Sequence, residues 1–196
     1  MITLADQKIF KTIQGEGALL GTPMIFVRLG GCSIGCIGCD TAYDQSKIEM
    51  TSKDIANEIK TIGGGIKWVW VTGGEPTDQD LNELISEIKN SNREKSIAIA
   101  TSGRKRIDAK YDFISVSPHG HPDLQAIHSG NQINIVPILN GLNLNDWKEY
   151  SFYYQFEHCW ITQLNGKIPD SDLLKWIDMF PFFRLGIQAH KVWRIP

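Results

Sequence analysis

The sequence has little of what marks membrane, secreted or nucleic-acid-binding proteins. No apolar run approaches the roughly 20 residues that a membrane-spanning helix needs, and residues 1–10 lack the basic start and apolar core of a signal peptide. Lysine and arginine number 20 against 22 aspartates and glutamates, so there is no basic surplus for binding nucleic acid. We therefore expect a cytoplasmic protein with no membrane or nucleic-acid partner.

Cysteine is also scarce, with four residues in the chain. In a reducing compartment this number favours metal or redox chemistry over disulfide bonds. Three of the four lie in the glycine-rich stretch from Arg28 to Thr41, RLGGCSIGCIGCDT, at spacings of four and three residues. A structural zinc site needs four ligands, so three thiols on one loop suggest a metal ion or cluster that is one ligand short.

The remaining composition is that of an ordinary globular protein. With 196 residues and 42% apolar content the chain is large enough to bury a core, and we expect a single domain over residues 1–196. Nearly continuous apolar runs are typical of parallel strands that helices cover. The runs that predict strands are 24–29, 67–72, 96–101, 113–117, 133–138, 152–156 and 182–187.

Amphipathic stretches between several of these runs predict helices over residues 51–62, 77–90 and 170–180. Thr51 and Asp54 have the spacing of a capping box at the start of the first helix. The alternation of strands and helices favours an α/β fold built from right-handed βαβ units. In such folds the chemistry gathers at the carboxyl ends of the strands.

Cys32, Cys36 and Cys39 lie at such a position, directly after the first predicted strand. Three thiolates at this spacing can converge on one 4Fe–4S cluster, which normally takes four cysteines. One iron would then stay open to an exchangeable ligand. The alternative is a zinc site completed by a histidine or by Cys159. Cys159 lies far along the chain in FEHCW, where we expect a buried apolar thiol.

The pattern Cx₃Cx₂C after the first strand of an α/β fold resembles the radical S-adenosylmethionine superfamily, and VTGGEPT (71–77) resembles its GGEP element. The resemblance implies a partial (βα)6 barrel of mostly parallel strands. It also implies a 4Fe–4S cluster on the three cysteines, with S-adenosylmethionine bound at the open iron. The implied S-adenosylmethionine-binding residues are Gly38, Asp40, Gly74, Glu75, Ser117, Pro118, His119 and Gln155.

Three positions depart from the superfamily's usual pattern. Gly38 stands where an aromatic residue usually packs on adenine, so the adenine contact would come from elsewhere. His119 replaces the lysine of a serine-proline-lysine element, and Phe156 replaces the proline that usually follows the glutamine at position 155.

The flanking stretches narrow the resemblance. FKTIQGEG before the first strand, CDT after the cysteines, SVSPH and QAHKVW closely resemble the family of 7-carboxy-7-deazaguanine synthases, in order along nearly the whole chain. The family reaction converts 6-carboxy-5,6,7,8-tetrahydropterin to 7-carboxy-7-deazaguanine with loss of ammonia, a carbon–nitrogen lyase reaction of queuosine and deazapurine biosynthesis. The resemblance implies that S-adenosylmethionine is used catalytically and that Mg²⁺ takes part.

The resemblance also implies a substrate site. Glu16 can accept hydrogen bonds from the N–H and NH₂ edge of a pterin, and Arg28 can pair with the substrate carboxylate. Thr41 would ligate Mg²⁺, which accepts neutral oxygen ligands, and Asp40 would orient that shell. The implied substrate-binding residues are Ile13, Gln14, Gly15, Glu16, Arg28, Thr72, His190 and Pro196.

Two other functions fit parts of the sequence. An activase that makes a glycyl radical on a partner protein would share the two main motifs, but would need neither IQGEG nor a magnesium-binding threonine. A zinc-binding interaction module without catalysis would use the cysteines alone. His119, His121 and His128 also hint at zinc, although scattered histidines in a loop are usually solvated. The family reading further implies an electron donor such as flavodoxin or ferredoxin, and a homodimer.

Overall fold

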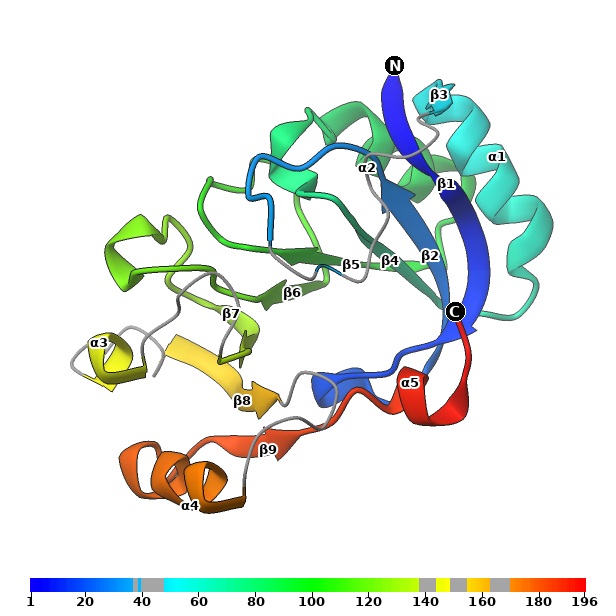
Figure 1. Cartoon of the computed structure of the whole chain (residues 1–196). Coiled ribbons are helices and arrows are strands. Elements are labelled where there is room, and N and C mark those ends of the chain that lie inside the picture. The colour runs from blue at the N-terminus through cyan, green and yellow to red at the C-terminus, as the bar shows by residue number, and fades with distance from the viewer. Residues whose placement is uncertain (37–38, 40–47, 138–143, 149–154, 163–169) are drawn as a thin grey trace.

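The structure is a computed structural model, and it describes residues 1–36, 39, 48–137, 144–148, 155–162 and 170–196. Nine strands in these ranges form one sheet (Figure 1). They are β1 (Ile2–Ile13), β2 (Pro23–Leu29), β3 (Ile48–Met50), β4 (Trp68–Gly73), β5 (Ser96–Thr101), β6 (Phe113–Val116), β7 (Gly130–Ile135), β8 (Phe156–Thr162) and β9 (Arg184–Gly186).

The strand order is β3-β1-β2-β4-β5-β6-β7-β8-β9. From β2 to β9 each neighbouring pair is parallel, whereas β1 pairs antiparallel with both β2 and β3. Each new parallel strand is added beside the previous one, and β3 and β9 remain at opposite edges of the curved sheet (Figure 1). This mostly parallel, unclosed sheet confirms the predicted α/β class and partial barrel.

Five helices in the described ranges accompany the sheet. They are α1 (Ser52–Gly63), α2 (Asn82–Ser91), α3 (Leu144–Lys148), α4 (Asp170–Met179) and α5 (Ala189–Trp193), with 3₁₀ turns η1 (Gly17–Leu19), η2 (Pro76–Asp78) and η3 (Pro122–Leu124). None of the helices in the described ranges combines the length and apolarity needed to cross a bilayer.

The two faces of the sheet carry different side chains. In β2, β4 and β5 alternate residues point outward and pack with the apolar stripes of α1 and α2; they include Ile25, Val27, Val69, Val71 and Ile97. The intervening residues point inward and include Met24, Phe26, Trp70 and Ala98. Because the inner face also carries polar residues such as Ser115, Gln132 and Asn134, it is suited to binding a ligand.

The start of α1 confirms the predicted cap. The Asp54 N–H donates to the Thr51 hydroxyl oxygen at 3.1 Å, and the Thr51 hydroxyl donates to the Asp54 carboxylate at 2.7 Å. Such a cap satisfies one of the amides that the first turn of a helix leaves unpaired. Ile55 and Ile59 of the predicted stripe are fully buried.

Three predicted elements differ most from their predicted bounds. The strands predicted over 133–138 and 152–156 are β7, which starts at Gly130, and β8, which starts at Phe156. Both contain polar residues that face the inside of the sheet, so apolar runs alone misplaced them. The helix predicted over 77–90 is divided, because Pro76 opens the separate turn η2 and α2 begins only at Asn82.

Candidate active site

A cavity of about 490 Å³ lies on the inner face of the sheet, within the size range of small-molecule sites. It is lined by residues from the ends of β2, β4, β5, β6 and β7. The loop that carries Cys32, Cys36 and Cys39, called the cysteine loop below, and the C-terminal segment from Gln188 to Pro196 complete the lining. Cys32, Cys36 and Cys39 all line it and are reduced thiols. The sequence and the fold thus place the three candidate cluster ligands at one hollow.

The two sequence motifs meet through their backbones. The Gly74 N–H donates to the Leu29 carbonyl at 2.8 Å, and the Glu75 N–H donates to the Gly31 carbonyl at 3.1 Å. A Cβ atom at Gly74 would collide with the Gly31 oxygen, so this close approach requires glycine. The cysteine loop therefore rests directly on the turn that carries Glu75.

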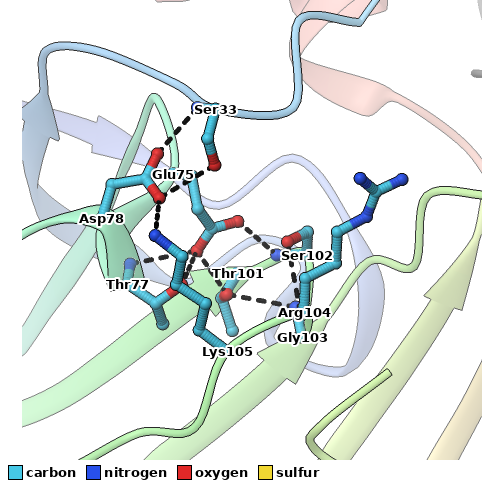
Figure 2. A network of polar contacts seen from close by, with 9 residues as sticks. All are labelled: Ser33, Glu75, Thr77, Asp78, Thr101, Ser102, Gly103, Arg104 and Lys105. Atoms are coloured by element: carbon cyan, nitrogen blue, oxygen red, sulfur yellow. Dashed lines mark hydrogen bonds and ion pairs between the residues drawn. The ribbon is translucent and has the colours of Figure 1, made fainter. Parts of the chain in front are cut away.

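A side-chain contact extends this support (Figure 2). The Asp78 carboxylate accepts from the Ser33 N–H at 2.7 Å and from the Ser33 hydroxyl at 2.9 Å, and it pairs with the Lys105 ammonium at 2.5 Å. Burial alone would raise the pKa of the Asp78 carboxyl, but the hydrogen bonds from Lys105 and Ser33 outweigh burial and lower that pKa below its usual 3.8. Asp78 thus holds the residue next to Cys32.

Glu75 is a buried carboxylate in the cavity wall, with an exposed fraction of 3%. It accepts from the Thr77 N–H at 3.0 Å, the Thr77 hydroxyl at 2.7 Å, the Thr101 hydroxyl at 2.5 Å and the Ser102 N–H at 2.8 Å (Figure 2). These donors come from the turn after β4 and from the end of β5. They fix the orientation of a carboxylate that can accept from a ligand ammonium.

His119 reaches the cysteine loop. Its Nδ1 atom lies 3.4 Å from the Cys36 Sγ atom, and the Arg104 side chain donates to the His119 carbonyl at 2.7 and 3.2 Å. Burial lowers the pKa of His119, and the Arg104 charge lowers it further, while Glu75 opposes the shift. The histidine that replaces the family lysine is therefore a neighbour of Cys36.

The other two histidines of this region lie away from the cavity. His121 and His128 are exposed and contact their own loop, through the Asp123 N–H and the Gln125 carbonyl. In the described part of the chain no three histidine, cysteine, aspartate or glutamate side chains already surround a common metal position. A closed zinc site built on these histidines thus finds no support.

Residues 14–16 reach the opposite end of β2. Because Ile13 pairs with Pro23, these residues lie at the start of β2, whereas the cysteines follow its end. β2 has seven residues, which at 3.3 Å each span about 20 Å. The cavity nevertheless includes both groups of residues.

Glu16 is surrounded by amides and by the C-terminal segment. Its carboxylate accepts from Asn134 Nδ2 at 3.1 Å and from Gln188 Nε2 at 2.9 Å, and His190 Nδ1 lies 4.0 Å away. A Cβ atom at Gly15 would collide with the His190 ring. The predicted residues Gly15, Glu16 and His190 are thus neighbours, although they are distant in sequence.

Gln14 and Arg28 offer donors to the cavity. Gln14 is buried, its Oε1 atom accepts from the Glu16 N–H at 3.2 Å, and its buried Nε2 atom has no hydrogen-bond partner among the described residues. A buried donor of this kind calls for a ligand acceptor or a water. Arg28 lines the cavity beside Thr72, its neighbour in β4, and its guanidinium lies 5.0 Å from the centre of the Phe10 ring.

The structure gathers most of the predicted site residues and leaves one out. Ile13, Thr72, Ser117, Pro118 and Pro196 line the cavity with those already described. Gln155 does not line the cavity. It is exposed and directly precedes β8, so it lies at the amino end of that strand and not at a carboxyl end. The prediction had put it at the end of a strand, and that placement is wrong. Gly38, Asp40 and Thr41 lie outside the described residues.

Some cavity residues were missed in the sequence. Thr101 ends a predicted strand and Ser102 directly follows it, so the rule of chemistry at strand ends could have found them. Asn134 interrupts the apolar run INIVPI, which is a signal for a polar inner face. Gln188 opens the stretch QAHKVW, but nothing in that stretch indicates its contact with Glu16.

Known proteins resemble this chain both in sequence and in fold. The Radical SAM superfamily model matches residues 26–147. The 7-carboxy-7-deazaguanine synthase of Burkholderia multivorans is 30% identical over 219 residues, which cover 100% of both chains. That of Haemophilus influenzae is 29% identical and covers 94% of this chain and 90% of the relative. The crystal structure of QueE from Escherichia coli matches with a TM-score of 0.74 at 23% identity, covering 96% and 94% of the two chains, which establishes the fold.

Radical SAM enzymes carry a 4Fe–4S cluster and S-adenosylmethionine. The three cysteine thiols at the cavity fit a cluster with one open iron, and the oriented Glu75 carboxylate beside them fits the amino group of the cofactor. The comparisons favour neither a glycyl-radical activase nor a zinc-binding module. The chain belongs to the 7-carboxy-7-deazaguanine synthase family of the Radical SAM superfamily.

Proposed function

We propose that the chain converts 6-carboxy-5,6,7,8-tetrahydropterin to 7-carboxy-7-deazaguanine with loss of ammonia, as a carbon–nitrogen lyase of queuosine and deazapurine biosynthesis. One observation carries the proposal: a single cavity joins the three cysteines and Glu75 to Glu16 and Arg28. A glycyl-radical activase would instead need a groove for a protein loop, and the comparisons give no support for one.

Different residues of the cavity would bind the cluster, the cofactor and the substrate. Cys32, Cys36 and Cys39 would hold the cluster, and the cluster with S-adenosylmethionine supplies radical chemistry when bound. Glu75 would accept from the cofactor's amino group. The remaining anchors would hold the substrate in a reactive orientation, which is a large part of what an active site contributes to rate.

Two substrate anchors have complementary chemistry. The Glu16 carboxylate would accept from the N–H and NH₂ edge of the pterin, and Arg28 would form a bidentate pair with the substrate carboxylate. Gln14, with its buried donor, would add a hydrogen bond to a ring acceptor. The support for these roles is that all three side chains line the cavity.

The proposal has further components. Thr41 would ligate Mg²⁺ at the substrate, a flavodoxin or ferredoxin would supply electrons, and the chain would act as one domain in a cytoplasmic homodimer. Size-exclusion chromatography with light scattering tests the last point, and a mass near twice 22.1 kDa is expected.

The test of the reaction is direct. Protein reconstituted anaerobically with iron and sulfide is incubated with S-adenosylmethionine, a reductant and the carboxytetrahydropterin, and the products are identified by mass. We expect 7-carboxy-7-deazaguanine from the native chain and none from Cys36→Ala. Cleavage of the cofactor with unchanged pterin would overturn the proposal.

A further inference from the structure

Two amide side chains meet the Glu16 carboxylate, one on each oxygen. Asn134 on β7 donates from Nδ2 to Oε2 at 3.1 Å, and Gln188, just before α5, donates from Nε2 to Oε1 at 2.9 Å. Asn134 is 2% exposed and belongs to the cavity wall, as does Gln188. The family resemblance assigns a role to neither residue.

The oxygen of each amide accepts a hydrogen bond from a further side chain. Lys191 Nζ donates to Gln188 Oε1 at 2.8 Å, and the Thr162 hydroxyl donates to Asn134 Oδ1 at 2.6 Å. An amide has an acceptor end and a donor end, and an ammonium can only donate. Lys191 therefore turns the donor end of Gln188 toward Glu16. The Thr162 hydroxyl is fully buried and could donate or accept, so the Glu16 carboxylate decides which end of Asn134 faces it, and the hydroxyl then holds the Asn134 oxygen in place.

These contacts fix the orientation of the Glu16 carboxylate plane. A flipped amide would bring an oxygen against a carboxylate oxygen, which is repulsive, so the carboxylate favours the observed orientation of both amides. The Lys191 ammonium favours the same orientation of Gln188. With each oxygen tied by one N–H, the carboxylate plane is set by β7 on one side and by the C-terminal segment on the other. A carboxylate has about four lone-pair sites, so it can accept from a ligand as well.

We propose that Asn134 and Gln188 are positioning residues that set the plane of the Glu16 carboxylate, so that the cavity selects ligands with two adjacent N–H donors, and that Thr162 and Lys191 orient the two amides. The ligand class is a 2-amino-4-oxo-pyrimidine ring, which has such an edge, and this part rests on the proposed function. Thr162 acts through Asn134 from outside the cavity lining, whereas Lys191 also lines the cavity, so Lys191→Arg is the control for its charge there.

The test compares two ligands that differ only at this edge. Reconstituted protein is titrated by calorimetry, anaerobically and with S-adenosylmethionine present, with 7-carboxy-7-deazaguanine and with its analogue that lacks the 2-amino group. A hydrogen bond to a charged acceptor is worth enough to give the native chain a preference of roughly 10- to 100-fold for the first ligand. The measured quantity is this ratio, which a general loss of stability would not lower selectively.

Two pairs of variants test the orienting residues. Thr162→Val keeps the shape but removes the hydroxyl, and Thr162→Ser keeps the hydroxyl; Lys191→Met removes the ammonium, and Lys191→Arg keeps a positive donor. We expect the preference to fall at least threefold in the first variant of each pair and to be retained in the second. Because Lys191 lies on the short helix α5, its variants remain informative if a change at buried Thr162 impairs folding.

The outcomes separate the inference from the proposed function. If the native chain prefers the amino-bearing ligand but Thr162→Val and Lys191→Met keep the full preference, the positioning inference is wrong and the proposed function stands. If the native chain shows no preference between the two ligands, both the assigned ligand edge and the inference fail.

Discussion

At the scale of single residues, Glu75 and Asp78 show how nearby carboxylates on one turn take different tasks. Glu75 points into the cavity and is oriented by hydroxyl and amide donors from two strand ends. Asp78 holds Ser33 and with it the cysteine loop. The buried carboxylate of Glu75 and the contact that supports the cysteine loop are thus placed by one segment, which keeps their relative position constant.

Cys159 gives the clearest prediction for a single residue. It is buried within β8, and burial raises the pKa of its thiol to about 11. At pH 8 the thiol is therefore protonated and unreactive, since the thiolate is the nucleophile and metal ligand. We expect Cys159→Ala to retain iron and sulfide after anaerobic reconstitution and Cys36→Ala to lose them.

Alkylation provides an independent check on the same residue. In the cluster-free protein at pH 8, iodoacetamide should modify the three loop cysteines and leave Cys159 intact, as peptide mass analysis would show. Loss of the cluster in Cys159→Ala as complete as in Cys36→Ala would contradict a three-cysteine cluster.

The site residues that the sequence revealed are those whose spacing is itself the signal. The cysteines and Glu75 lie in short motifs, and Glu16 lies in IQGEG. The contacts of Asn134 and Gln188 with Glu16 could not be found this way, although Gln188 opens the stretch QAHKVW, because they join residues 118 and 172 positions apart. Such contacts depend on how the sheet curves, which local patterns do not encode.

At the scale of elements, the cysteine loop depends on η2 for its position. Removing the carboxylate in Asp78→Ala leaves the Ser33 N–H and hydroxyl without their acceptor. We expect the reconstituted variant to lose iron to a chelator several times faster than the native protein, measured by the decay of the cluster absorbance. Lys105→Met is the matched control: Lys105 is half exposed, and such surface pairs contribute only about 0–1 kcal/mol.

The direction of the pKa shift sets the pH range for this prediction. Because the folded-state pKa of Asp78 lies below 3.8, its stabilising contribution is complete above that value and is lost as the pH falls through the folded-state pKa. The comparison of variants at pH 7 to 8 is therefore made with the carboxylate fully ionised. Equal decay rates in Asp78→Ala and Lys105→Met would show that the loop does not depend on the Asp78–Ser33 contact.

The elements differ in how far the sequence predicted them. β5 begins and ends as predicted, and α1 has the predicted cap and stripe, because both have a clear period. β1 was not predicted, since its pairing register shifts between Leu4 and Ile9, and such an irregularity changes which side chains face the core. β7 was displaced because its inner face carries the polar cavity residues Gln132 and Asn134, and β8 because polar residues such as His158 and Thr162 interrupt its apolar pattern.

At the scale of the whole molecule, the two ends of the chain close one end of the cavity together. The Ala189 N–H donates to the Gly15 carbonyl at 2.9 Å, and the Thr12 hydroxyl donates to the Pro196 oxygen at 2.8 Å. In Figure 1 the red segment with α5 lies beside the end of β1. The end of the cavity that contains Glu16 therefore forms only when the end of β1 and the C-terminal segment are both in place.

A chain that stops after Ile187 tests this closure. It lacks Gln188, His190 and α5 but keeps the cysteine loop and the sheet, so we expect the cluster absorbance to remain and the thermal midpoint to fall by a few degrees. Affinity for 7-carboxy-7-deazaguanine should fall at least tenfold, since the Glu16 carboxylate loses its Gln188 donor. The control is Val192→Ala in the full chain, because Val192 is 73% exposed on α5. Unchanged affinity in the shortened chain would contradict the closure.

An isotopic measurement shows most directly whether this cavity carries out the proposed deazaguanine synthase reaction. The family resemblance implies that S-adenosylmethionine is used catalytically, whereas an activase would consume it. The reconstituted protein is given the pterin substrate deuterated at C6, and the recovered S-adenosylmethionine and the product are quantified by mass. We predict deuterium in the recovered cofactor and more product than cofactor consumed. Stoichiometric 5′-deoxyadenosine, with no deuterium returned to S-adenosylmethionine, would contradict the account.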